Sequence, residues 1–329
     1  MTTSLSRCVS RILLGGLAAA LALAAPLADA DYPDRPIRLV VPFPAGGGAD
    51  TLARIIVPKL SQALGTTIVI DNRPGAGGNV GAEIVARASP DGYTLLYGTN
   101  GTHAINQTLY ASLRFDPIRD FAPVSRMTAI AAMLVVNPDF PPKTVAELID
   151  YAKRHPGTVN FASAGNGTTS HLAGELFRTM AGIDIVHVPY RGGALAAADL
   201  MSGQVQMMID VMPNVYPLVK AGRLRGLAST TAQRFPAAPE YPTIAESGLP
   251  GFVVTAWDGI FAPAGTPPAI VDRLNEAVRQ ALDDREVRES LLLHGAQAVP
   301  GTPEALARHV AEETEKWAKV VRKSGAKID

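Results

Sequence analysis

The regular alternation of short apolar runs with segments of helical periodicity constrains this chain more than any other feature. Apolar runs at 37–43, 67–70 and 93–97 predict strands. The segments 52–64 and 79–88 between them carry apolar residues at helical spacing. This β-α-β-α-β order predicts an α/β fold with a mostly parallel sheet and helices on its faces.

The middle of the chain repeats the pattern after a long stretch of strand character at 121–136. Thr144-Val-Ala-Glu147 is a capping box, which predicts the start of a helix. The elements predicted after this helix are strands and helices in turn: 159–163, 170–180, 185–188, 194–201, 205–211, a helix after Pro213, and 224–228.

Prolines predict where several helices begin or break. Thr266-Pro267 and Thr302-Pro303 each look like an N-cap followed by a proline at the first helical position. Pro58 lies inside the helical segment 52–64, where it predicts a kink or a break. The two helices at the end of the chain have no strands of their own, so we place them against the first sheet.

That placement predicts two domains, the first of them discontinuous. Domain 1 comprises residues 31–130 plus 255–329, and domain 2 comprises residues 131–254. The extended stretches 121–136 and 253–262 then form a hinge of two crossover strands. A cleft between two lobes follows from this layout.

The first thirty residues are predicted to be a signal peptide, residues 1–30, cleaved before Asp31. Two arginines precede an apolar run, and small residues end it. The alternative is a membrane anchor, but the run of about 14 residues is shorter than the roughly 20 that span a bilayer. The only cysteine, Cys8, precedes this run, so the exported chain is predicted to fold without disulfides.

Charge and motif content disfavour several classes of function. The chain has 30 Lys and Arg against 30 Asp and Glu, with no basic run, which argues against a nucleic-acid partner. The six histidines lack metal-ligand spacing, so we expect no metal and no cofactor. Gly-x-Ser-x-Gly is absent, and a hydrolase or isomerase using Ser163 and His171 would lack a clear aspartate to orient the histidine. We therefore expect no enzyme.

Three glycine-rich loops, 42–50, 72–81 and 163–171, fall where a predicted strand feeds a predicted helix. Ligands of open α/β sheets bind outside the carboxyl ends of strands. Helix N-termini there expose unpaired N–H groups, and glycine lets the backbone approach a ligand closely. Any one loop could be only a tight turn, but three at equivalent positions favour anion binding.

A carboxylate fits these loops better than a phosphate. No lysine follows Gly48 or Gly167 as a phosphate-binding loop requires, and Asp50 would repel a polyphosphate. A carboxylate can be held by backbone N–H groups together with the hydroxyls of residues such as Thr168 and Thr169.

Four residues outside the runs of glycine each have two possible roles. His171 either donates to a ligand or satisfies the loop backbone, and Arg191 either meets an anion or is solvated. Asp210 either accepts from an amine or hydroxyl of the ligand or ties down the following turn. Trp257 either floors the cleft or belongs to the core.

The candidate ligand-binding residues come from two of the loops and from the strand ends near them: Phe43, Ala45, Gly46, Gly47, Asp50, Ser163, Gly165, Gly167, Thr168, His171, Tyr190, Arg191, Asp210 and Trp257. In contrast, His187 and the pair Met207-Met208 are predicted to pack within the sheet.

An ordered set of segments resembles a known family over essentially the whole exported chain. The segments are VVPFPAGGGADTLARI, DNRPGAGGNVGAEIVA, GYTLLYG, ASAGNGTTSHLAGELF, HVPYRGG, AESGLPGF and FAPAGTPP. Together they are similar to the substrate-binding proteins of tripartite tricarboxylate transporters, also called the Bug family.

The resemblance implies a monomeric periplasmic protein with the two-lobed periplasmic-binding-protein (Venus flytrap) fold. Such proteins hold a di- or tricarboxylate, an acidic amino acid or an aromatic acid between two facing loops, often through ordered waters. They deliver it to the membrane permease subunits of a tripartite tricarboxylate transporter. A ligand sensor for a membrane signalling partner is the alternative, since the same fold would serve.

By position, the resemblance makes Phe43 to Asp50 the first clamp loop and Ser163 to His171 the second. Asp210 stands where the family has an acidic residue. Pro58 and Asp258 depart from the family pattern, and Asp258 leaves the ligand specificity at the far end of the cleft open.

Overall fold

The computed structural model describes residues 32–328, and all helices and strands that it describes lie in one compact unit beginning at Arg35. The predicted signal peptide, residues 1–30, lies outside the described residues. Within 32–328, none of the helices combines the length and the apolar character that crossing a bilayer requires.

The first part of the chain forms the predicted β-α-β-α-β order. β1 pairs in parallel with both β2 and β3, as expected for strands joined by crossover helices. The elements are β1 (Ile37–Val41), α2 (Gly48–Leu64), β2 (Ile68–Asn72), η1 (Ala76–Gly78), α3 (Asn79–Ala86) and β3 (Thr94–Thr99).

Helix α2 continues as one element through Pro58, so the predicted break is not found. Pro58 is exposed, whereas Ile56, Val57 and Leu60 around it are buried. The hydrogen bond that proline cannot donate is therefore lost on the solvent side. The apolar face on the other side holds the helix together.

The second part of the chain also alternates as predicted, although two short elements precede it. Thr144 accepts a hydrogen bond from the backbone N–H of Glu147 at 3.1 Å, which confirms the predicted N-cap. The elements are η2 (Gly101–Ile105), α4 (Asn106–Leu109), β4 (Phe121–Val136), α5 (Val145–Arg154), β5 (Val159–Ser163), α6 (Thr169–Ala181), β6 (Ile185–Pro189), α7 (Gly193–Met201), β7 (Met207–Val211), α8 (Met212–Lys220) and β8 (Arg225–Ser229).

The strands form one mixed sheet of ten, ordered β2-β1-β3-β9-β4-β7-β5-β6, in which β8 and β10 (Ala296–Ala298) each pair with β4. The predicted parallel pairing holds for β1 with β2 and β3 and for β5 with β6 and β7. β4 and β9 (Thr255–Pro263) instead pair antiparallel with all their neighbours. They are the two predicted crossovers, and they traverse the sheet in opposite directions. The division into two domains at 130 and 254 stays a prediction.

The end of the chain forms α9 (Pro268–Asp283), α10 (Arg285–Leu293) and α11 (Pro303–Ser324). Thr302 caps α11 as predicted, accepting from the N–H of Ala305. The predicted cap at Thr266 is wrong: Pro267 is the N-cap of α9, and the Thr266 hydroxyl donates to the carbonyl of Pro263 instead.

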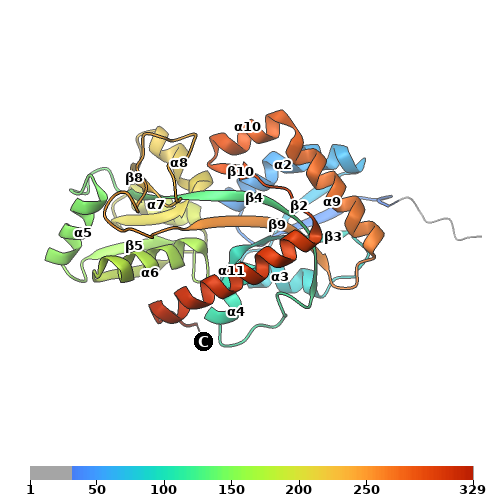
Figure 1. Ribbon diagram of the computed structural model, residues 1–329, viewed down its shortest axis with the longest axis horizontal. Helices are drawn as coiled ribbons and strands as arrows, with labels where there is room; N and C mark the ends of the chain where they lie inside the picture. Colours follow the sequence, from blue (N-terminus) through green and yellow to red (C-terminus); the bar gives the residue numbers. More distant parts are fainter. Residues whose placement is uncertain (1–31, 329) are drawn as a thin grey trace, which may run out of the picture. The chain divides into compact units, whose positions relative to one another are not determined.

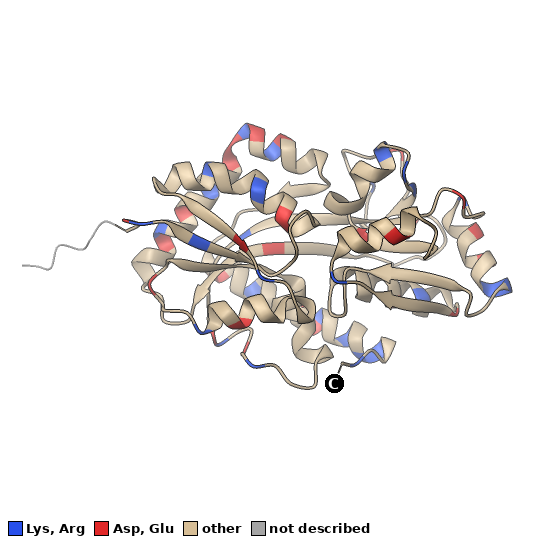
Figure 2. Ribbon diagram, turned by 180° about the vertical axis from the view of Figure 1, so that it is seen from behind, with Lys and Arg blue, Asp and Glu red and all other residues tan. Residues whose placement is uncertain are grey.

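These last helices cover both sides of the central strands. Figure 1 shows α2, α9 and α10 above β4 and β9, and α3, α4 and α11 below them. α9 packs against α2 and β4, as the placement on the first sheet predicts. α11 packs against β4 and η2, and it also contacts α6 in the second part of the chain. Acidic and basic residues are interspersed along the helices and loops in Figure 2.

Two apolar cores lie on opposite faces of the sheet, and β7 contributes to both. Met207 and Ile209 belong to one core, and Met208 belongs to the other. Because neighbouring residues of a strand point to opposite faces, the methionine pair packs within the sheet as predicted.

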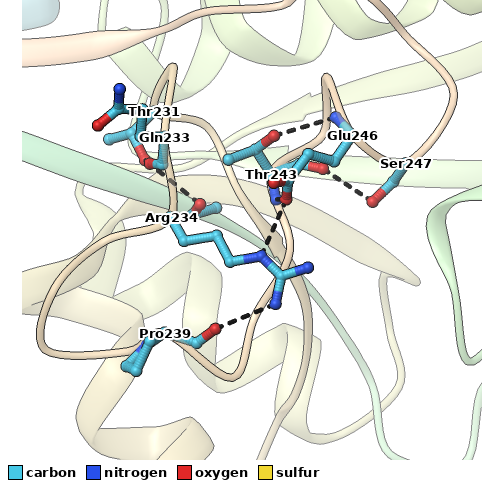
Figure 3. A network of polar contacts seen from close by, with 8 residues as sticks. Thr231, Gln233, Arg234, Pro239, Thr243, Glu246 and Ser247 are labelled. Atoms are coloured by element: carbon cyan, nitrogen blue, oxygen red, sulfur yellow. Dashed lines mark hydrogen bonds and ion pairs between the residues drawn. The ribbon is translucent and has the colours of Figure 1, made fainter.

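The long connection from β8 to β9, residues 230–254, is ordered by local polar contacts (Figure 3). The Glu246 carboxylate accepts from the Arg234 guanidinium at 3.1 Å and from the N–H of Thr243 at 2.8 Å. The Thr243 hydroxyl in turn accepts from the N–H of Glu246. At the two ends of this connection, Thr230 donates to the carbonyl of Val254, so the chain enters β9 from a fixed point.

The carboxylate of Glu313 on α11 joins the last helix to β9. It accepts from the indole N–H of Trp257 at 3.2 Å and from that of Trp317 at 2.9 Å. These are the two tryptophans of the chain, and each is 1% exposed. One acidic side chain therefore satisfies two buried donors, one of them next to Asp258.

Glu313→Leu is expected to lower the free energy of unfolding by about 2–4 kcal/mol, because two buried indole N–H groups lose their acceptor. Glu313→Gln keeps one carbonyl acceptor and should lose clearly less. Urea unfolding followed by circular dichroism measures both. Equal losses in the two variants would show that packing, and not hydrogen bonding, determines the effect.

Candidate ligand-binding cavity

A cavity of about 370 Å³ lies where the N-terminal ends of α2, α6 and α7 meet the ends of β3 and η2 and the strand β9. Apolar side chains such as Phe43, Leu52 and Ile130 contribute much of its wall. The polar groups are few and come from separate elements. This combination of an apolar wall and a few placed polar groups is typical of a small-molecule site.

The loop from β1 to α2 presents an uncapped helix N-terminus to the cavity. Gly47 is the N-cap of α2, and no side chain caps this end. Asp50 lies behind the loop, where it accepts from the N–H of Gly46 at 2.9 Å and from Arg54 at 2.8 Å. Asn72 bridges Asp50 and the carbonyl of Phe43. Asp50 thus braces the loop and does not line the cavity.

The pKa of Asp50 reflects this bracing. Burial alone would raise it, but hydrogen bonds from Arg54, Gly46 and Asn72 outweigh burial, so the pKa lies below its usual value. Asp50 is therefore ionised at neutral pH, and its charge is compensated within the loop.

The loop from β5 to α6 presents Thr168 and Thr169 to the cavity. Thr168 is the N-cap of α6; its hydroxyl accepts from the N–H of His171 and donates to the carbonyl of Gly165 at 2.7 Å. Ser163 lies behind the loop and accepts from the N–H of Gly165.

Two stacked histidines support this second loop from behind. The rings of His171 and His187 lie 4.3 Å apart, and His187 Nε2 lies 2.7 Å from the Ser163 hydroxyl. Burial lowers the pKa of His171 to about 4 and that of His187, together with the neighbouring His171, to about 3. Both are neutral at pH 7, and His171 Nδ1 accepts a hydrogen bond from the backbone N–H of Gly167 within the loop at 3.4 Å.

A third helix N-terminus, that of α7, also faces the cavity, and it is not among the three predicted loops. Its N-cap Gly192 has no side-chain cap. A Cβ at Gly193 would lie 2.5 Å from Asn214 Nδ2 and 2.7 Å from Asp210 Oδ2, so glycine lets these two side chains approach the start of α7. The Gly-Gly pair at 192–193, which follows β6 after two residues, is the signal that could have found it. The predicted loop 72–81, in contrast, does not line the cavity.

Three charged residues reach the cavity. Arg191 is exposed at its mouth, whereas Asp210 and Asp258 are 4% and 0% exposed. Asp210 accepts from Asn214 Nδ2 at 2.6 Å, and burial raises its pKa to about 6. Trp257 is buried in the core and also lines the cavity.

Asp258 is the best-bonded of these groups. It accepts from the backbone N–H of Thr128 at 3.1 Å, from the Thr128 hydroxyl at 2.8 Å and from the Tyr97 hydroxyl. Burial raises its pKa to about 6 even so. Tyr97, Thr99, Asn100 and Gly101 line the cavity beside it, and none of them was predicted.

The segments on the two sides of the cavity touch each other. The Thr169 hydroxyl donates to Asn100 Oδ1 at 3.0 Å. A Cβ at Gly192 would lie 2.9 Å from Pro44, and a Cβ at Gly48 would lie 2.8 Å from Val211. Glycine thus allows the helix ends on the two sides of the cavity to approach each other closely.

The candidate residues from the sequence divide into two sets. The structure brings seven to the cavity wall: Phe43, Ala45, Gly47, Thr168, Arg191, Asp210 and Trp257. The other seven lie outside the wall in supporting positions: Gly46, Asp50, Ser163, Gly165, Gly167, His171 and Tyr190. Tyr190, for example, donates to Asp199 at 2.8 Å. Within residues 32–328 no three His, Cys, Asp or Glu side chains are grouped so as to hold a metal ion.

Solved structures include close matches to this fold. A Rhodopseudomonas palustris protein with adipate is 42% identical, with a TM-score of 0.89 over 91% of this chain and 100% of that one. MatC from the same organism, with bound malate, is 40% identical, with a TM-score of 0.84 over 88% and 100%. The periplasmic binding protein BugD is 36% identical, with a TM-score of 0.86 over 90% and 99%.

Curated relatives agree with the structures. BugT of Bordetella pertussis is 38% identical over 317 residues, which cover 96% of this chain and 97% of the relative. A UPF0065 protein from the tcbD-tcbE intergenic region of Pseudomonas sp. strain P51 is 42% identical over 315 residues, 94% and 93% of the two chains.

The profile of the tripartite tricarboxylate transporter family receptors, TctC, matches residues 52–326. This family consists of substrate-binding receptors, so the expectation of a binding protein and not an enzyme is confirmed. The fold is the α/β fold of the periplasmic binding proteins of this type, with a mixed sheet. The chain belongs to the tripartite tricarboxylate transporter receptor (Bug/TctC) family.

Proposed function

We propose that this protein captures a small carboxylate in the cavity at the helix N-termini. The ligand class comprises di- and tricarboxylates, acidic amino acids and aromatic acids. The protein then delivers the ligand, in the periplasm, to the membrane subunits of a tripartite tricarboxylate permease. The family supports the permease as partner, and the relatives with adipate and malate support the ligand class.

The observation that carries the proposal is the convergence of three helix N-termini on one cavity. α2 and α7 begin there with glycine N-caps and no side-chain cap, and α6 begins there with Thr168. Unpaired N–H groups and the positive end of the helix dipole favour an anion at each.

The free energy of binding requires several helix N-termini to act together. Micromolar binding needs about −8 kcal/mol, and one helix end contributes at most about 2 kcal/mol. Charge-assisted hydrogen bonds add roughly 1.5–3 kcal/mol each. Several donors from opposite sides of the cavity must therefore act together, and a carboxylate with two oxygens can meet them.

Carboxylate binding is expected to raise the melting temperature, because a ligand that binds only the folded protein stabilises it. At 100 times its dissociation constant it adds about 2.7 kcal/mol. Differential scanning fluorimetry with dicarboxylates, tricarboxylates, acidic amino acids and aromatic acids measures the shift. No shift with any of them at millimolar concentration would overturn the proposal.

Gly47→Leu is expected to abolish the ligand-induced shift, since it adds a bulky side chain to the cavity wall at the α2 N-terminus. Gly47 has φ −82° and ψ 172°, and a Cβ there meets only the carbonyl of Pro44 at 3.4 Å, so the fold tolerates a side chain. Gly47→Ala is the matched control and should retain most of the shift.

Gly167 is less suitable for this test, because a Cβ there would lie 2.3 Å from Asn106 Oδ1 and disturb the loop itself. If Gly47→Leu keeps the melting temperature and the full ligand-induced shift, the α2 N-terminus does not bind the ligand.

A further inference from the structure

One corner of the cavity is formed by Tyr97, Asn100 and Asp258. The hydrogen-bonding groups of this corner are not needed to hold a carboxylate at the helix N-termini. In the antiparallel pairing of β3 with β9, Thr99 lies opposite Asp258. Directly opposed residues point to the same face of a sheet, and so do residues two apart in a strand. Tyr97 and Asp258 therefore share one face, and Asn100 follows at the end of β3.

Asp258 retains capacity to accept a hydrogen bond. Its Oδ1 receives two donors from Thr128 and its Oδ2 receives the Tyr97 hydroxyl. A carboxylate offers about four acceptor positions, so about one is left. Within residues 32–328 the hydrogen bonds to Asp258 come from neutral donors only. The Arg126 guanidinium on β4 interacts with this charge without donating a hydrogen bond to the carboxylate.

Asn100 supplies a donor at the same corner. Its side-chain oxygen accepts from the Thr169 hydroxyl, but its Nδ2 is buried and has no partner within the described residues. Asn100 is 2% exposed and lines the cavity. A buried donor left unpaired is costly, and a ligand can provide the acceptor that the protein lacks.

The charges around the cavity disfavour a second carboxylate on the ligand. Asp210 lines the same cavity as Asp258, and Arg191, the cation among its described lining residues, is exposed. One carboxylate can be held by the helix N-termini. Another would face two acidic side chains in a poorly solvated space, where like charges repel strongly.

Resting on the proposed function, we propose that the ligand is a monocarboxylate with a second polar group, a hydroxyl or an ammonium, that donates to Asp258. A hydroxyl can also accept from Asn100, which an ammonium cannot. Asp258 then determines specificity, because it selects hydroxy- and amino-substituted monocarboxylates against dicarboxylates of the same length.

Isothermal titration calorimetry with matched series tests this selection. In each series only the group at the far end changes: hexanoate, 6-hydroxyhexanoate, 6-aminohexanoate and adipate; butyrate, 4-hydroxybutyrate, 4-aminobutyrate and succinate; 4-methylbenzoate, 4-hydroxymethylbenzoate, 4-aminomethylbenzoate and terephthalate. In the series that fits best, the hydroxyl or ammonium member should bind at least about tenfold tighter than both the unsubstituted acid and the diacid.

Asp258→Asn keeps the shape and a carbonyl acceptor but removes the charge. We expect it to lose the preference for the hydroxyl or ammonium member by about tenfold and to gain affinity for the diacid. Asp283→Asn, the same change at an exposed acidic residue on α9, is the control and should bind like the wild type. Melting temperatures verify that both variants are folded.

Asn100→Asp distinguishes a ligand with a hydroxyl from a ligand with an ammonium. It keeps the acceptor for Thr169 but replaces the unpaired donor by an oxygen. A hydroxyl-bearing ligand should bind more weakly to this variant, whereas an ammonium-bearing ligand should bind equally or better. An equal effect on all members of a series would overturn the assignment of Asn100 to the ligand.

The possible failures are distinguishable. If the wild type binds diacids or unsubstituted acids best, or if Asp258→Asn keeps the wild-type order, the inference is wrong although the proposed function stands. If the wild type binds no carboxylate, the proposed function fails, and this inference fails with it.

Discussion

The antiparallel pairing of β4 with β9 is the interaction on which the rest of the structure depends. β4 bonds to β9 and β10 along its first half and to β7 and β8 along its second half. The helices whose N-termini form the cavity start from strands on both sides of this pair. Ile130 on β4 and Trp257 on β9 also lie in the cavity wall. The two strands therefore set the distance between the loops at the cavity and contribute to the cavity wall.

The local pattern of apolar residues predicts many of the helices and strands, but it predicts only some of the residues that line the cavity. The strands at 121–136 and 159–163 have the predicted bounds, because apolar runs with clear ends leave little choice. The cap at Thr266 failed because the local motif competes with a hydrogen bond from Thr266 to Pro263. The role of Asn100 could not be predicted, since it depends on contact with Thr169, 69 residues away. Sequence periodicity does not predict which side chains meet when they lie far apart in the chain.

Two of the three predicted glycine-rich loops line the cavity, and their polar residues divide between two positions. Thr168 faces the cavity, whereas Asp50, Ser163 and His171 hold the loops from behind. The pattern of residue types is the same for both roles, because a carboxylate-binding loop and a braced turn need the same short polar side chains. Bracing fixes the backbone N–H groups before a ligand arrives, which reduces the entropy cost of binding.

Glu313 extends this preorganisation beyond the loops. Its carboxylate holds Trp257, and the neighbouring Asp258 is held by Tyr97 and Thr128. The helix that carries Glu313 also contacts η2 and α6, which lead to the two sides of the cavity. The orientation of β9 at the cavity is therefore fixed by the last helix of the chain as well as by strand pairing. Because these contacts fix where the donors and acceptors of the wall lie, a ligand whose polar groups were misplaced would leave buried groups unpaired, and that penalty would favour ligands that match the wall.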